Sequence, residues 1–312
     1  MPAFPKPKFT HPFTVNDEIQ SLQNHKAHRG IPEKVNDKLL LGTWNIANLG
    51  LQERWDSHYE LLAEIVGWFD IMAVQEVYDD LVGIRAIEGL LPSYYSLIFS
   101  DKAGNNERFA FLYDSRKIKM LEMVGEVSVP PKDYRYIKLD GVDTPFNGFD
   151  RNPYLCSFEF NNFNFLLINV HNFFGSESKE HVDRRSLEAY ALGRYADLRR
   201  KSKNSYTKNI IAMGDFNLPK KEAGDPIYDA LTKRGLKLPE HSTKIYSNIL
   251  NDKQYDQIAF APGIKSLIEA NGVFDFDHVI FPELWEESPA NFRKYLRYYI
   301  SDHRPLWMQL EV

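Results

Sequence analysis

The sequence predicts an α/β domain in which β-sheets pack on one another and helices flank them. Short apolar runs of strand length alternate with longer segments whose apolar residues recur at helical spacing. Several expected strands follow each other closely enough to form hairpins. Many of the runs end in a polar residue, at the position where α/β proteins usually carry their binding and catalytic groups.

The individual elements follow from these patterns. The apolar residues of 61–69 have helical spacing. Asn161-Asn162 has the length of a two-residue hairpin turn between two apolar runs. Asp225 before a proline is a typical helix start. We expect strands at 39–46, 71–75, 108–113, 152–160, 163–170, 209–213, 255–260 and 305–312. We expect helices at 55–69, 80–90, 180–200 and directly after Asp225.

The chain has 312 residues, of which 43% are hydrophobic and 14% aromatic, and this is ample for a packed core. Residues 1–37 are polar, contain prolines and show little periodicity, so we expect an N-terminal arm or an irregular lead-in. The polar strand ends extend from Asn45 to His303. A single domain at 38–312 must therefore contain them all.

The longest apolar run, 163–170, is much too short to span a membrane, and the N-terminus has no apolar signal core. The single cysteine, Cys156, cannot form an internal disulfide, which favours a reducing, cytoplasmic location. Because Cys156 alternates with apolar neighbours in an expected strand, we interpret it as a buried structural thiol.

The net charge of -5 argues against tight non-specific nucleic-acid binding by bulk charge. Two basic segments stand out locally, at 194–208 and at 292–297, and the second has interleaved aromatic residues. Either segment is a solvated helix face or loop, or else a site for an anionic ligand.

Three of the polar residues at strand ends are candidate metal ligands. Glu76 ends a buried run, Asp302 lies before the last strand, and Asn45 offers a neutral oxygen. Oxygen ligands of this kind suit Mg²⁺, which keeps several of its waters. The alternative for Glu76 is that it caps the helix that follows.

Asp215 and Asn217 follow the strand at 209–213 and are two positions apart, so they share one face of an extended chain. Asp215 is a candidate to orient or deprotonate a water molecule, and Asn217 is a candidate donor to developing oxyanion charge. The alternative is an Asx turn, which is common in such sequences.

Two histidines and one arginine complete the candidate set. A histidine that acts in catalysis needs a carboxylate to orient its ring, and the acids left at strand ends give the pairs Asp256 with His303 and Glu107 with His171. Arg151 can clamp a phosphate through two parallel hydrogen bonds, or it can form a surface ion pair with its neighbouring aspartate.

Taken in order, six short motifs resemble the endonuclease/exonuclease/phosphatase superfamily, which has the DNase I-like fold. They are Trp-Asn-Ile at 44–46, Gln-Glu-Val at 75–77, Val-His-Asn at 170–172, Gly-Asp-Phe-Asn at 214–217, Tyr-Asp-Gln-Ile at 255–258 and Ser-Asp-His-Arg-Pro at 301–305. The resemblance covers about 39–312. It implies a four-layer α/β sandwich with two central mixed sheets, and a Mg²⁺- or Mn²⁺-dependent hydrolysis of phosphoesters.

The resemblance also implies roles for residues. It makes Asn45, Glu76 and Asp302 metal-site residues, Asp215 the group that positions the attacking water, and Asn217 and Arg151 phosphate contacts. The two histidine–carboxylate pairs, His303 with Asp256 and His171 with Glu107, become acid/base or phosphate-stabilising groups.

The sequence departs from the family pattern at three positions. Ala47 stands where the apurinic endonuclease branch has an aspartate, while Tyr78 and Asn105 stand where DNase I has groove-binding arginine and tyrosine residues. Three hypotheses follow: a DNase I-like nuclease, with DNA favoured over RNA; a phosphatase or phosphodiesterase acting on a small-molecule or lipid phosphate ester; and a non-catalytic module that kept the fold.

Overall fold

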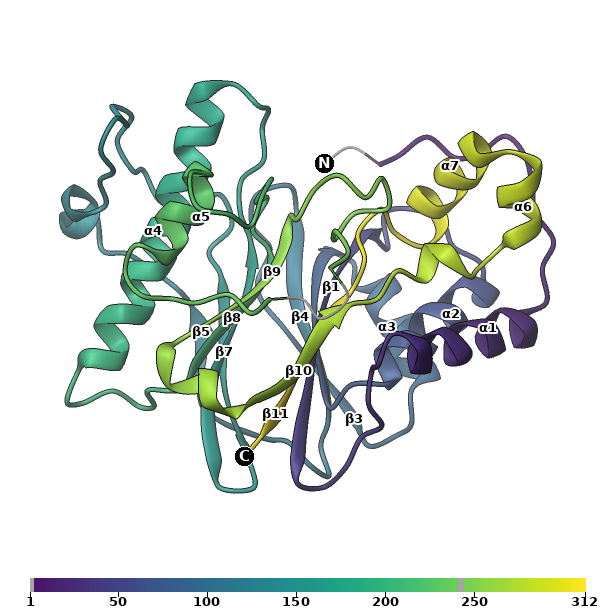
Figure 1. The fold of residues 1–312 in the computed structure, drawn as a ribbon, viewed down its shortest axis with the longest axis horizontal. Helices are drawn as coiled ribbons and strands as arrows, with labels where there is room; N and C mark the ends of the chain where they lie inside the picture. The colour runs from purple at the N-terminus through teal and green to yellow at the C-terminus, as the bar shows by residue number, and fades with distance from the viewer. Residues whose placement is uncertain (1–2, 241–243) are drawn as a thin grey trace.

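In the computed structural model, which describes residues 3–240 and 244–312, two mixed β-sheets lie face to face between two layers of helices (Figure 1). The first sheet has the order β10 (Ile268–Val273), β11 (Leu306–Glu311), β1 (Lys38–Leu49), β2 (Ile71–Tyr78), β4 (Glu107–Asp114) and β3 (Tyr95–Phe99). The second has the order β5 (Lys119–Glu126), β6 (Tyr154–Phe160), β7 (Phe163–His171), β8 (Ile210–Asp215) and β9 (Asp256–Phe260). This is the predicted four-layer sandwich.

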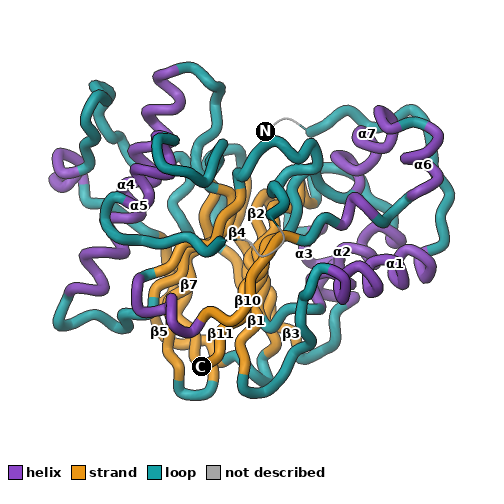
Figure 2. Tube along the Cα trace, viewed as in Figure 1, coloured by secondary structure: helices purple, strands orange, loops and turns teal. Residues whose placement is uncertain are grey.

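The helices divide between the two outer faces, as the secondary-structure colouring shows (Figure 2). The first sheet is covered by α1 (Val15–His28), α2 (Asp56–Gly67), α3 (Val82–Leu90), α6 (Pro282–Glu287) and α7 (Pro289–Tyr299). The second sheet is covered by α4 (Lys179–Lys201) and α5 (Pro226–Thr232). Among the described residues, none of the helices combines the length and the apolar character that crossing a membrane requires.

Successive side chains of β1 point to opposite faces of the sheet, so the strand contributes to two hydrophobic clusters. Leu39 and Leu41 pack into the cluster between the sheets, whereas Leu40 and Trp44 pack into the cluster beneath the helices. Cys156 belongs to the cluster between the sheets and is fully buried, as predicted. Burial raises the pKa of its thiol to about 12, so the thiol stays protonated at neutral pH.

The structure corrects the expectation of an irregular segment before residue 38, because α1 lies there. Its sequence is polar, with Leu22 as its fully buried apolar residue, and it is held in part by charge. The carboxylate of Asp275 accepts hydrogen bonds from Arg29 at 2.6 and 2.7 Å, and it also contacts His25 at 2.7 Å and His278. A helix held in this way lacks the apolar stripe by which helices are identified in a sequence.

Replacing Asp275 with asparagine should lower the free energy of unfolding of the full chain by about 3 kcal/mol. The reason is that Arg29 and His25 would then lie against a buried neutral amide in place of the carboxylate. Burial opposes ionisation of Asp275, but hydrogen bonds from His25, His278 and Arg29 outweigh it and lower the pKa. A lowered pKa stabilises the fold above the ordinary aspartate pKa, and this contribution is lost as the pH falls towards the folded-state value. Denaturant unfolding of both proteins at several pH values tests this. A difference below about 1 kcal/mol at neutral pH would contradict it.

Candidate active site

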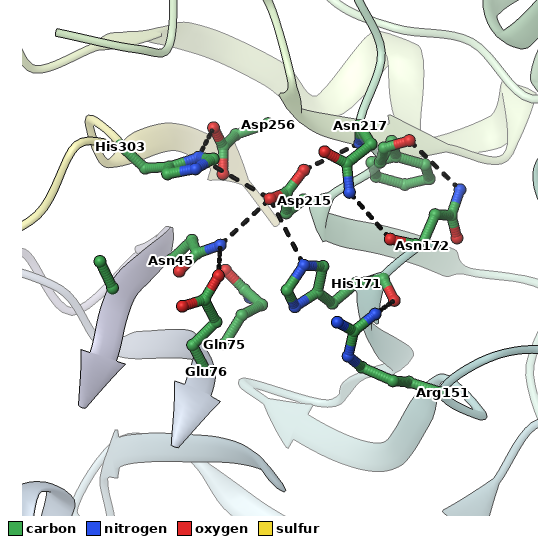
Figure 3. Close-up of polar contacts among 12 residues, drawn as sticks. Asn45, Gln75, Glu76, Arg151, His171, Asn172, Asp215, Asn217, Asp256 and His303 are labelled. Carbon is green, nitrogen blue, oxygen red and sulfur yellow. Dashed lines mark hydrogen bonds and ion pairs between the residues drawn. The ribbon is translucent and has the colours of Figure 1, made fainter. Parts of the chain in front are cut away.

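The candidate residues meet at one edge of the sandwich, where β1, β2, β7 and β8 end (Figure 3). The pairs β1–β2 and β7–β8 are parallel, so their polar ends point to the same edge. The antiparallel strands β4 and β9 begin there, and they bring Glu107 and Asp256. The loop before β11 adds His303. This convergence is what the strand-end pattern of the sequence predicted.

Irregular backbone at the ends of β1 and β2 directs the Glu76 carboxylate. Glu76 and Asn48 both have positive φ values, 59° and 49°, and the strand pairing shifts register beside each of them. The Glu76 carboxylate accepts hydrogen bonds from Asn45 Nδ2 at 2.9 Å and from Asn48 N at 2.8 Å. Left-handed backbone at non-glycine residues is costly and tends to cluster at functional sites. The helix-capping alternative fails for Glu76, because Asp80 accepts the hydrogen bond from Val82 N at the start of α3.

Asp215 lies at the centre of the site and is buried. Its Oδ2 accepts a hydrogen bond from Asn45 Nδ2 at 3.1 Å, and the same oxygen lies 3.7 Å from His171 Nε2 and 3.8 Å from His303 Nδ1. Burial raises the pKa of Asp215, but the two imidazoles and its hydrogen bonds outweigh burial, so that the pKa is lowered overall. Asp215 is therefore an ionised carboxylate between two histidines.

The Asx turn, which was the alternative interpretation of Asp215 and Asn217, is also present. Asp215 Oδ1 accepts a hydrogen bond from Asn217 N at 2.8 Å, and Asn217 has a positive φ of 50°. Asn217 Nδ2 donates to the carbonyl oxygen of Asn172 at 2.8 Å. The turn and the functional role do not compete here, because one carboxylate oxygen closes the turn while the other faces the site (Figure 3).

The predicted pair of His303 and Asp256 forms, with Nδ1 2.8 Å from Asp256 Oδ2. Burial disfavours a charged His303, but the carboxylates of Asp256 and Asp215 outweigh it and raise its pKa well above the usual value. Burial raises the pKa of Asp256 to about 6, with Asp215 adding to the shift and His303 opposing it. His303 therefore holds its proton more firmly than an exposed histidine, and it can donate it as a hydrogen bond.

The second predicted pair is looser and includes the arginine. His171 Nδ1 lies 3.4 Å from Glu107 Oε2, and Arg151 Nε donates to the same oxygen at 2.9 Å. Burial opposes ionisation of Glu107, but hydrogen bonding to His171 and the electrostatic attraction of His171 and Arg151 outweigh it and lower the pKa. Arg151 is 5% exposed and also contacts Asp150 at 3.1 Å, so the ion-pair alternative is realised, but in a buried position behind His171.

The donor atoms fit a hard cation. Asn45 Oδ1 and Asp256 Oδ1 are buried and accept no hydrogen bond from the described residues, and Glu76 adds a carboxylate beside Asn45. One oxygen each from Asp215 and Asp256 and a nitrogen from His303 also lie within 4.8 Å of one another. The half-buried carboxylate of Asp302, the third expected ligand, contacts Arg297 Nε at 3.2 Å.

Several residues that support the site were not among those predicted from the sequence. Ser301 Oγ donates to the Asn45 carbonyl at 2.7 Å and accepts from His303 N at 3.0 Å, so it joins β1 to the His303 loop. Gln75 Nε2 donates to Asn169 Oδ1 at 2.6 Å and links the two sheets inside the core. The sequence contains a signal for Gln75 and Asn169, because both are polar residues inside apolar runs and a buried polar side chain requires a hydrogen-bond partner.

This architecture is the DNase I-like fold, which solved structures of endonuclease/exonuclease/phosphatase proteins share. An endonuclease/exonuclease/phosphatase from Bacteroides vulgatus is similar at a TM-score of 0.59 and 16% identity, over 88% of this chain and 99% of that one. The mannosyl-6-phosphatase of Bacteroides thetaiotaomicron is similar at 0.57 and 21%, over 87% and 99%. TDP2 of D. rerio, complexed with a single-strand DNA product, is similar at 0.54 and 13%, over 88% and 99%. No protein-family model and no curated protein matches the sequence.

Proposed function

We propose that the protein is a divalent-metal-dependent phosphoester hydrolase, and specifically a DNase I-like nuclease that hydrolyses nucleic-acid phosphodiesters. The observation that carries the proposal is the buried Asp215 carboxylate, which lies between His171 and His303 and is bonded to Asn45. Its neighbours supply hydrogen-bond donors for phosphoryl oxygens on one side and oxygen ligands for a cation on the other. A structural ion pair would not require two separate histidine–carboxylate pairs around one buried acid.

Asn45 and Glu76 would hold the cation, Mg²⁺ or Mn²⁺, which supplies a Lewis acid that offsets charge on the phosphoryl oxygens. Asp302 would join them only if it released Arg297. Asp215 orients the attacking water and accepts its proton through Oδ2. Because Asn45 and Asn217 N hold its two oxygens, the carboxylate needs no reorganisation during the reaction.

The two histidines bind the phosphate. His303, kept protonated by Asp256, donates to a non-bridging oxygen, and His171 donates from the opposite side of Asp215. Asn217 Nδ2 has two hydrogens, of which the Asn172 carbonyl takes one. Arg151 holds Glu107, and through it His171. Its direct contact with phosphate stays a prediction.

A second candidate function is hydrolysis of a small phosphate ester. It is supported by the likeness to the mannosyl-6-phosphatase, while the likeness to TDP2 with a DNA product supports the nuclease. Tyr78 replaces the groove-binding arginine of DNase I, and Asn105 replaces its groove-binding tyrosine. These replacements favour a substrate other than duplex DNA bound in the DNase I manner. Preference for DNA over RNA and a cytoplasmic location stay predictions.

The test is incubation of the protein and Mg²⁺ or Mn²⁺ with circular plasmid, single-stranded DNA, RNA and a sugar phosphate. We expect cleavage of at least one polynucleotide, and we expect EDTA to abolish it, because chelation removes the cation from Asn45 and Glu76. Cleavage of the closed circle shows endonuclease action. Release of phosphate from the sugar ester alone supports the second candidate. Absence of hydrolysis of any of these substrates would support the non-catalytic module.

A further inference from the structure

A groove of about 320 Å³ opens beside His303, between α7 and the loop that leads into β9. We call it the α7 groove. It is lined by basic side chains, together with His303 and the aromatic ring before Asp256: Lys253, Tyr255, Arg293, Lys294, Arg297 and His303. His303 thus belongs both to the active site and to the groove. A molecule that bound in the groove would approach the site that holds the phosphate.

The α7 groove has more cationic than acidic side chains. Arg297 contacts Asp302, and the groove's other acid, Asp252, accepts a hydrogen bond from Asn248 at 2.6 Å. Within the described chain, Lys253, Lys294 and Arg293 have neither an ion pair nor a side-chain hydrogen bond, although Arg293 lies over the ring of Trp285. The groove thus has four cationic side chains and two acids, and a concave surface with this excess of positive charge favours an anionic group.

The α7 sequence itself produces this arrangement. Phe292, Tyr295, Leu296 and Tyr299 are buried beneath the helix at helical spacing, which leaves the basic residues on the opposite face. An adjoining cavity of about 460 Å³, lined by residues 4–9 of the N-terminal segment, shares Lys294 and Arg297 with the groove. This cavity adds Lys6, which is paired with Glu53, and Lys8, so basic residues continue beyond the groove.

We propose that the α7 groove binds a second phosphate group of the same substrate, so that the favoured substrates carry another phosphate next to the one that is hydrolysed. This proposal rests on the proposed function, because it takes the scissile phosphate to lie at His303. Tyr255, whose ring lies 6.0 Å from that of His303, forms an aromatic wall on the path between the two phosphates. A polynucleotide strand has this combination of regularly spaced phosphates and flat rings.

The test compares a dinucleotide that has one phosphate with the same dinucleotide phosphorylated at both ends. In the variant K253Q/R293Q/K294Q, KM for the phosphorylated dinucleotide should rise about tenfold, because each lost surface contact is worth a modest amount. Its kinetics with the single-phosphate dinucleotide should not change. The matched control R199Q/K203Q/K208Q removes the same charges from the segment at and beyond the end of α4, on the opposite side of the molecule (Figure 1), and should not alter KM for either substrate.

Binding measured by calorimetry in EDTA separates the groove from catalysis. The parent protein should bind the phosphorylated dinucleotide about tenfold more tightly than the single-phosphate form, and the α7 groove variant should lose this difference. If neither dinucleotide is hydrolysed but the binding difference and its loss are observed, the nuclease assignment fails and the anion site stands. If the parent binds both forms equally, or if the α4 control loses as much affinity as the groove variant, the groove proposal is overturned.

Discussion

The variant Asp215→Asn should lose at least about 10³-fold in the rate of phosphodiester hydrolysis while it keeps the fold. The amide fills the same space, and it can still accept the hydrogen bond from Asn217 N that closes the turn. It cannot accept a proton from water, and it removes the negative charge between His171 and His303. The measurement is the single-turnover rate on a labelled oligonucleotide with Mg²⁺ or Mn²⁺.

The control for this variant is Asp143→Asn, a change at an exposed aspartate outside the site, which should leave the rate unchanged. Circular dichroism and thermal unfolding of both variants establish that the fold is intact. Turnover of Asp215→Asn within tenfold of the parent would refute the role given to Asp215.

The variant His303→Ala should lower the same rate by about 10²–10³-fold, because a preorganised donor to the phosphoryl oxygens is lost. The change also leaves the Asp256 carboxylate without the imidazole that it contacts at 2.8 Å. Asp256, whose pKa burial already raises to about 6, would then be neutralised more readily, so the variant loses a positive charge without leaving a strong negative one.

His28→Ala is the matched control for His303→Ala, since His28 is exposed on α1. Its rate should equal that of the parent. If His303→Ala keeps near-normal turnover, or if its rate falls only in proportion to a loss of folded protein, then His303 is structural and the phosphate site lies elsewhere.

The central strands could be predicted from the sequence, and the three missed strands lie at sheet edges. The runs that form β1, β2, β7 and β8 are buried on both faces over most of their length, and they are therefore mainly apolar. The missed strands β3, β5 and β10 are at the edges of the two sheets, and they are partly exposed. In β5 exposed and half-exposed residues alternate, so the segment lacks the apolar run that identifies a strand.

The residues of the candidate site could be selected from the sequence, but their geometry could not. A polar residue at the end of a buried run is visible in a sequence, and Asn45, Glu76, His171 and Asp215 were identified in this way. The direction of a side chain depends on long-range contacts, which a local pattern does not contain. Asp302 shows this limit, because its neighbour His303 enters the site while Asp302 itself contacts Arg297 on α7.

The buried amide pair of Gln75 and Asn169 has a consequence for anyone who engineers this protein. Asn45, Glu76 and Glu107 belong to one sheet, and His171, Asp215 and Asp256 belong to the other, so a small slide between the sheets would separate the site into two halves. Apolar contacts between sheets resist separation but tolerate sliding, whereas the Gln75–Asn169 hydrogen bond forms in one alignment only. A redesign for thermostability that replaced both amides with leucine would remove this hydrogen bond. The resulting protein could be more stable and still lose activity, because the two sheets would no longer be held in the alignment that assembles the site.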